Sequence, residues 1–141
     1  MKSVQCPMHL PGGSLLSISD VLAAFPENRY VWVIFEFFGV GRAPMGMGMP
    51  EFEDRVRSAP KGLQMTWADL EAFGVGVTQA FECEIVAFRA ADYYGVQCNV
   101  DLAVAKICAL DSTEWCVSVD ETAEEFRSVL NAVRRIAAET K

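Results

Sequence analysis

The segment RYVWVIFEFFGV, residues 29–40, constrains the fold most strongly because it is apolar at almost every position. β-branched and aromatic residues dominate it, which is typical of a strand. A strand exposed on one face would alternate apolar and polar residues, so this continuous pattern predicts a strand that is covered on both faces. Trp32, Ile34 and Phe35 are its expected core residues. Glu36 interrupts the run, which is far shorter than the roughly 20 residues of a membrane-spanning helix.

Three more segments are predicted to be strands: residues 81–89, 100–110 and 113–119. In the first of them Cys83, Ile85 and Ala87 point to one side, and Glu82 and Glu84 share the other. The third follows the second after a tight turn at residues 111–113, and its Trp115 is expected to lie in the core, as is Trp67.

Three segments carry helix signals. Ser17 with Asp20 and Thr66 with Asp69 have the spacing of a capping box, and they predict helices over residues 17–25 and 66–79. Gly74 and Gly76 weaken the second helix but allow close packing. A third, C-terminal helix is expected to begin at Thr122, because apolar residues recur at helical spacing from Phe126 to Ala137.

The order helix, strand, loop, helix, three strands, helix predicts an α+β fold. Three strands in succession favour antiparallel pairing. We therefore expect a single domain over residues 1–141, with a mainly antiparallel sheet of about four strands packed against helices, including a long C-terminal helix. A chain of this length buries enough surface to fold without a disulfide or a metal.

A segment rich in methionine and glycine, residues 39–50, is predicted to be a long connection, with a possible short helix following at residues 51–58. It lacks the glycine spacing and the Gly-Lys-Ser/Thr ending of phosphate-binding loops. A mobile linker is one interpretation, and Met45, Met47 and Met49 forming an adaptable contact patch is another.

The formal net charge is −7, and it is unevenly distributed along the chain. Residues 1–50 are neutral overall, whereas residues 66–125 contain twelve acidic residues against Arg89 and Lys106. Such a surface repels nucleic-acid phosphates and anionic lipids and attracts a basic partner. A simply solubilising surface accounts for part of the excess.

Catalytic and metal-binding chemistry have little support. His9 is the single histidine; it has ligand-like spacing from Cys6, but no second pair completes a zinc site. The five cysteines include no CxxC pair, which favours buried, reduced thiols. We expect no metal, no cofactor and no enzymatic activity. Because no apolar run near the start is long enough for a signal peptide, we expect a cytoplasmic protein.

The segments TWADLEAFGVGVTQAFECEIVAF and ALDSTEWCVSVDETAEEF, within residues 64–135, resemble stretches of small bacterial immunity proteins. In that family a capped helix leads into a sheet strand, and an Asp-Ser turn precedes a Trp strand and a terminal helix. The resemblance implies an antitoxin that binds a secreted toxin domain, expected to be basic and enzymatic, and blocks its active site or substrate path. The expected contacts are Glu82, Glu84, Asp92, Tyr93, Tyr94, Asp111 and Glu114.

Two alternatives remain open. A non-inhibitory adaptor or chaperone needs an exposed apolar groove, for which the methionine-rich loop is the available hint. A small cytosolic enzyme needs a pocket with convergent polar groups. Asp92, Tyr93 and Tyr94 are expected in an exposed connection, although packing beneath a loop is the alternative for the two tyrosine rings.

Overall fold

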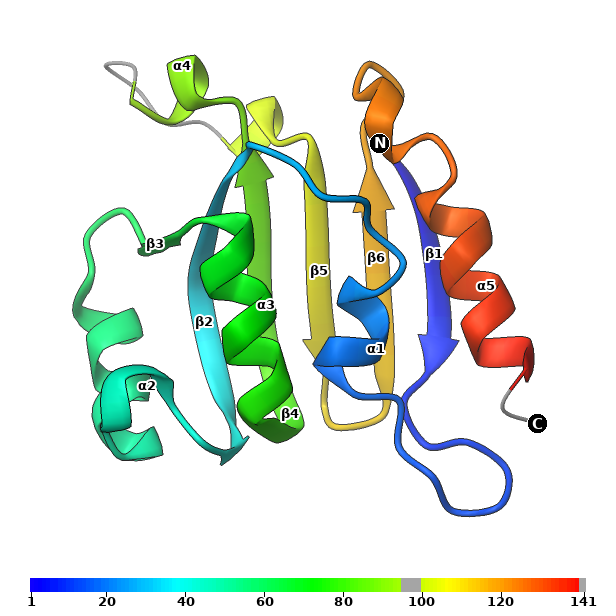
Figure 1. Ribbon diagram of the computed structural model, residues 1–141, viewed down its shortest axis with the longest axis horizontal. Helices are drawn as coiled ribbons and strands as arrows, with labels where there is room; N and C mark the ends of the chain where they lie inside the picture. The colour runs from blue at the N-terminus through cyan, green and yellow to red at the C-terminus, as the bar shows by residue number, and fades with distance from the viewer. Residues whose placement is uncertain (95–99, 140–141) are drawn as a thin grey trace.

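The computed structural model describes residues 1–94 and 100–139, and over these residues the chain forms an α+β fold with one antiparallel sheet. The sheet has six described strands in the spatial order β1-β6-β5-β4-β2-β3 (Figure 1). They are β1 (Lys2–Pro7), β2 (Val31–Gly41), β3 (Leu63–Met65), β4 (Val77–Phe88), β5 (Ala105–Leu110) and β6 (Glu114–Val119). The predicted fold class and antiparallel pairing are confirmed, but the predicted number of about four strands is wrong.

The two unpredicted strands lie at the two edges of the sheet. β1 pairs with β6, and most of its side chains are exposed. β3 has three residues and pairs with β2 from Trp32 to Ile34. An edge strand has one neighbour and buries less side-chain surface, so neither segment shows the periodic apolar pattern that identifies a strand in a sequence.

Five α-helices and three short 3₁₀ helices complete the described part of the chain. They are α1 (Ile18–Leu22), η1 (Pro44–Gly46), α2 (Met49–Ser58), α3 (Trp67–Gly76), α4 (Ala90–Tyr93), η2 (Val100–Leu102), η3 (Glu124–Phe126) and α5 (Val129–Glu139). The predicted capping boxes at the start of α1 and α3 are both formed, by Ser17 with Asp20 and Thr66 with Asp69. The possible helix after the methionine-rich loop is present as α2.

Several predicted boundaries are wrong. α3 ends at Gly76, and residues 77–79 begin β4 instead of finishing the helix. Gly74 and Gly76 permit close packing as expected, because a Cβ at Gly76 would approach the Arg42 carbonyl oxygen to 2.8 Å. The predicted strand 100–110 begins at Ala105, and it is joined to β4 by a long connection that contains α4 and η2.

The C-terminal helix also begins later than predicted. Thr122 does not cap it, because the Thr122 backbone N–H and hydroxyl both donate to the Asp120 carboxylate, at 2.9 and 3.0 Å. This arrangement is a local turn of the kind that Asp side chains favour. A 3₁₀ turn ending at Phe126 follows, and α5 begins at Val129.

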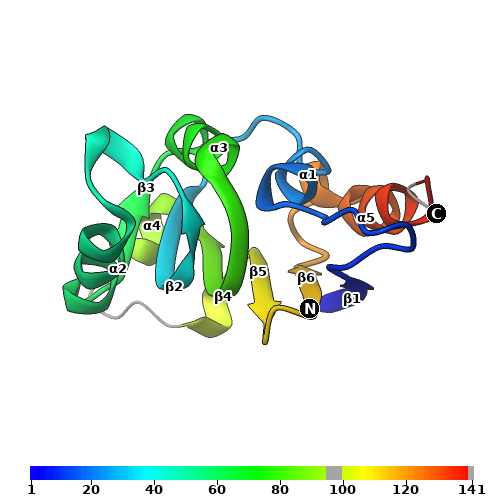
Figure 2. The ribbon, with the colours of Figure 1, turned by 90° about the horizontal axis from the view of Figure 1, so that it is seen from below.

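The helices are distributed unequally over the two faces of the sheet. Helices α1, α3 and α5 cover one face, while α2 lies beside the β2–β3 edge (Figure 2). The opposite face carries α4 at one end of β4 and is open over β5, β6 and β1 (Figure 2). Among the described residues no helix has the length and apolar character needed to cross a bilayer.

The main core lies between the sheet and the three covering helices. Trp32 and Trp115 are fully buried in it, and Trp67 is 5% exposed, so these three core predictions are confirmed. The buried indole N–H groups have hydrogen-bond acceptors. The Trp32 N–H donates to the Asn28 side chain at 2.9 Å, and the Trp115 N–H donates to the Leu16 carbonyl at 2.8 Å.

A second, smaller apolar cluster lies on the opposite face at the end of the sheet beneath α4. Its buried members are Val31, Val33, Val86, Phe88, Tyr93 and Ala103. Phe35 packs against this cluster and is only partly buried, because alternation along β2 places its side chain on the same face as Val33. The prediction of a strand covered on both faces is therefore confirmed for the first half of β2, whereas Phe35 is not a main-core residue.

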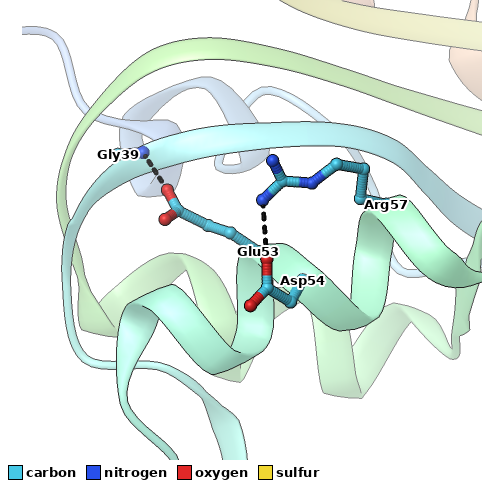
Figure 3. Close-up of polar contacts among 4 residues, drawn as sticks. All are labelled: Gly39, Glu53, Asp54 and Arg57. Carbon is cyan, nitrogen blue, oxygen red and sulfur yellow. Dashed lines mark hydrogen bonds and ion pairs between the residues drawn. The ribbon is translucent and has the colours of Figure 1, made fainter.

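Helix α2 covers a length of β2 that β3 is too short to pair. Glu53 in α2 accepts a hydrogen bond from the backbone N–H of Gly39 at 3.0 Å (Figure 3). On the same helix Asp54 and Arg57 form an ion pair at 2.9 Å, with both side chains exposed (Figure 3). The Glu53 carboxylate thus accepts a backbone hydrogen bond that a neighbouring strand would otherwise accept. Backbone N–H groups at the edge of a sheet lack such a strand.

Candidate partner-binding site

Two glutamates face each other on the open face of the sheet. Glu36 of β2 and Glu84 of β4 are direct register partners. The pairs that flank them, Ile34 with Ile85 and Phe37 with Cys83, are buried in the main core, so the two carboxylates point to the opposite face. Like charges directly opposite each other destabilise a sheet. The register thus places two like charges opposite each other on this face.

Two further carboxylates, Glu82 of β4 and Asp111 of the turn between β5 and β6, lie next to each other. The backbone N–H of Asp111 donates to the Glu82 carboxylate at 3.0 Å, and the N–H of Ser112 donates to the Phe81 carbonyl at 2.8 Å. These bonds attach the turn to β4. Asp111 and Ser112 both have positive φ, 51° and 59°, a backbone conformation that costs about 1 kcal/mol or more for a non-glycine residue.

The Asp111 carboxyl group alters the titration of Glu82. A hydrogen bond between their side chains raises the pKa of Glu82 above its ordinary value of 4.5, while the Asp111 N–H acts in the opposite direction. Repulsion from the Asp111 and Glu36 carboxylates also raises this pKa. Negative charge is therefore crowded here in the folded state.

Exposed apolar side chains lie among these carboxylates. Phe38 is the register partner of Glu82, is 57% exposed, and contacts Phe81 with ring centroids 5.2 Å apart. Val40 is 45% exposed and Leu110, next to the turn, is 38% exposed. We call this surface the acidic face, defined by Glu36, Phe38, Phe81, Glu82, Glu84 and Asp111.

One cation lies beside the acidic face. Lys106 of β5 approaches Glu84 to 3.6 Å, and both side chains are about one-third exposed. An ion pair of this length and exposure contributes little to stability. Glu114 of β6 is the register partner of Leu110 and extends the carboxylates toward β1.

The structure thus groups four of the predicted contacts and separates the other three. Glu82 and Glu84 share one face of β4 as predicted, with Asp111 and Glu114 at the same end of the sheet. Asp92, Tyr93 and Tyr94 lie in and after α4, at the other end of β4. Tyr93 is 6% exposed, so the expectation of an exposed ring is wrong there; Tyr94 is 63% exposed.

Sequence reasoning missed Glu36 and Phe38 as members of this surface. Both lie in the apolar run of β2, where Glu36 reads as an interruption. Their position on this surface follows from the register between β2 and β4. That register shifts between Ile34 and Glu36 and again after Phe38. Such shifts are set by β-bulges, and the sequence pattern alone does not give their positions.

His9 has a structural contact at the same end of the sheet. Its Nε2 donates to the Ser112 carbonyl at 2.7 Å, which joins the N-terminal segment to the β5–β6 turn. Cys6, its predicted companion, is buried. In the part of the chain that the structure describes, no group of three or more His, Cys, Asp or Glu side chains is arranged to hold a metal ion.

Three of the described thiols, Cys6, Cys83 and Cys108, lack the environment of a nucleophile. Burial raises the pKa of Cys108 to about 11, and it also raises the pKa values of Cys6 and Cys83. Reactive cysteines show the opposite shift, because the thiolate is the attacking species. Cys98 lies outside the described residues.

Comparisons with protein-family models, curated proteins and solved structures found no match to this chain. The resemblance to immunity proteins therefore rests on the two sequence segments named above, and the functional argument on the geometry of the acidic face.

Proposed function

We propose that this protein is an immunity protein that binds a basic toxin domain through the acidic face and blocks its active site or substrate path. The observation that carries the proposal is the opposed pair Glu36 and Glu84. A carboxylate pair that opposes folding stability is accounted for if a cationic partner neutralises it in the complex.

The composition of the surface supports the same function. Carboxylates complementary to a basic partner accelerate and orient association. The rings of Phe38 and Phe81 supply the aromatic contacts from which binding energy is commonly drawn. The chain's net charge of −7 adds a long-range field of the same sign.

The alternatives differ in what happens to the partner. An adaptor would leave a bound partner active, and the apolar hollow described in the next subsection is the feature that favours it. An enzyme has less support, because burial raises the pKa values of Cys83 and Cys108 and the acidic face is an open surface rather than a pocket.

The test has two steps. The tagged protein is used to isolate its partner from the native cells, and the activity of that partner is then measured free and bound. Inhibition at a one-to-one ratio is expected. A bound partner that keeps its full activity would favour the adaptor and overturn the inhibitor.

Matched variants locate the interface. Glu36→Gln with Glu84→Gln removes two charges from the acidic face, whereas Glu71→Gln with Glu124→Gln removes two exposed charges elsewhere. We expect the first pair to weaken binding about tenfold or more and to reduce its salt dependence, and the second pair to change binding about twofold or less. Equal effects of the two pairs would place the interface elsewhere.

A further inference from the structure

A hollow of about 780 Å³ lies between the loop of residues 41–49, helix α2, strand β3 and helix α3. It is separate from the acidic face, because it opens at the β2–β3 edge, beside helices that pack against the other side of the sheet. Its volume falls in the range of roughly 300–1,000 Å³ that is typical of small-molecule sites.

The lining of the hollow is mainly apolar. Four of the six methionines of the chain line it: Met45, Met47, Met49 and Met65. The buried rings of Phe52 and Phe73, with centroids 4.9 Å apart, also line it. Thioether side chains adapt their shape to a bound hydrocarbon and offer it a polarisable surface. We call this site the methionine hollow.

Met45, in this loop, is exposed and has an unfavourable backbone conformation. Met45 has φ 56° and ψ 30°, the left-handed region, and its side chain is 85% exposed. The base of the loop is fixed, because the Arg42 N–H donates to the Gly76 carbonyl at 2.7 Å. Backbone conformations of this kind cluster at active sites, ligand clamps and switch regions.

The charged residues at the hollow are mostly basic, in contrast with the chain as a whole. Arg42 and Arg55 line it, and Asp69 is the acidic group beside them. The Asp69 carboxylate is occupied in part by the capping box of α3, where it accepts from the Thr66 N–H at 3.4 Å. Arg55 contacts Glu51 at 3.6 Å on an exposed helix surface, a weak ion pair. Two guanidinium groups are therefore available to an anion.

We propose that the methionine hollow binds a small amphipathic carboxylate, whose hydrocarbon chain lies against the thioethers and whose carboxylate lies beside Arg42 and Arg55. The volume of the hollow lies in the range typical of small-molecule sites, and its two guanidinium groups are complementary to a carboxylate.

The experiment is a titration of the full chain, labelled with [¹³C-methyl]methionine, with dodecanoate. The methyl signals are assigned by single Met→Leu variants. We expect the signals of Met45, Met47, Met49 and Met65 to shift together with one saturating isotherm. The signal of Met8, 1% exposed in the main core, serves as the internal control and is expected to stay in place. Absence of a saturable shift, or equal shifts at Met8, would overturn the proposal.

Two sets of variants test separately where dodecanoate binds and whether its carboxylate contributes to binding. Ala72→Trp places a ring in the hollow from an exposed position on α3, and Ala138→Trp adds the same ring to an exposed position on α5. We expect Ala72→Trp to weaken dodecanoate binding about tenfold or more and Ala138→Trp to leave it unchanged. An unchanged affinity in Ala72→Trp would overturn the assignment of the site.

The double change Arg42→Gln and Arg55→Gln is expected to weaken dodecanoate binding about five- to tenfold without altering the binding of dodecanol, because each exposed guanidinium contributes modestly to the binding of an anion. If dodecanol binds the unaltered protein as tightly as dodecanoate, the carboxylate part of the proposal is wrong. These tests need no toxin partner, so their failure leaves the proposed function untouched.

Discussion

The carboxylate of Glu53 lies 3.0 Å from the backbone nitrogen of Gly39 and accepts its hydrogen bond at the edge of the sheet. Gly39 is buried, and β2 and β4 shift register beside it. In a variant that lacks the Glu53 carboxylate, this N–H would lose its hydrogen-bond acceptor. A buried donor left unsatisfied costs roughly 1–3 kcal/mol.

We therefore expect Glu53→Ala to lower the free energy of unfolding by about 1–3 kcal/mol, and Glu53→Gln to lower it less, since the amide oxygen still accepts. Urea denaturation followed by tryptophan fluorescence measures the change. Asp54→Ala is the matched control on the same helix, because its ion pair with Arg57 is exposed and is worth about 1 kcal/mol at most. Equal losses in the two alanine variants would contradict the role given to Glu53.

Relief of the opposed glutamates should stabilise the sheet. Glu36→Gln removes the repulsion from Glu84 at its register position, and we expect it to raise the free energy of unfolding by about 0.2–1 kcal/mol. Added salt should stabilise the unaltered protein more than this variant, because it screens the repulsion. Urea midpoints at low and high ionic strength provide the measurement, with Glu27→Gln, exposed in the connection before β2, as the control. A loss of stability in Glu36→Gln would show that the carboxylate makes a favourable contact instead.

The raised pKa of Glu82 predicts a pH dependence with a definite sign. Folding raises this pKa above the ordinary 4.5, so in the window between the two values the folded state binds more protons than the unfolded state. Lowering the pH through that window should therefore strengthen this local contribution to stability, and raising the pH should weaken it.

Glu82→Gln removes this titration but keeps an oxygen that can accept from the Asp111 N–H. We expect the difference in unfolding free energy between the variant and the unaltered protein to favour the variant more at pH 7 than at pH 4. Urea titrations at intervals between these values test the expectation, with Glu114→Gln as the control. A difference that grows as the pH falls would reverse the assigned sign.

The glycine at the end of β2 has no room for a side chain. Gly41 has φ +133°, and a Cβ there would meet the Gly76 carbonyl oxygen at 2.4 Å. We expect Gly41→Ala to cost more than about 2 kcal/mol, because both the backbone and the packing oppose it. Gly48→Ala is the control, since its Cβ would meet nothing closer than Pro50 at 3.8 Å. Thermal unfolding of both variants compares them, and a neutral Gly41→Ala would show that the loop base relaxes easily.

Sequence patterns were most informative where the residues that form an element also lie next to each other in the chain. The capping boxes of Ser17 and Thr66 and the apolar run of β2 involve near neighbours, and each predicted its element. The end of α3 depends on a tertiary contact, the approach of Gly76 to Arg42, and its predicted boundary was wrong. The start of α5 was also wrong, because Thr122 takes part in a turn with Asp120 instead of capping the helix.

The candidate site shows the same division. Glu82 and Glu84 could be placed on one face because a strand has a period of two residues. Their proximity to Glu36 and Asp111 depends on register shifts and on a turn attached to β4 by the Ser112–Phe81 hydrogen bond. The burial of Tyr93 depends on Phe88 of β4 and on Ala103 of the connection before β5, which are distant in the sequence.

The pairing of β1 with β6 also has a consequence for biosynthesis. Lys2 lies opposite Val119, so β1, which is translated before the other described strands, has no described partner until β6 has left the ribosome. We expect nascent chains to hold β1 unpaired while the β2–β4 region is already able to fold. Chains ending at Leu110 should then show fast amide hydrogen exchange across residues 2–7, whereas protection of those amides would mean that another segment shelters β1 during synthesis. The sequence of β1 is largely polar and ends in proline. Such a sequence resists pairing with other chains on the same polysome while β1 is unpaired.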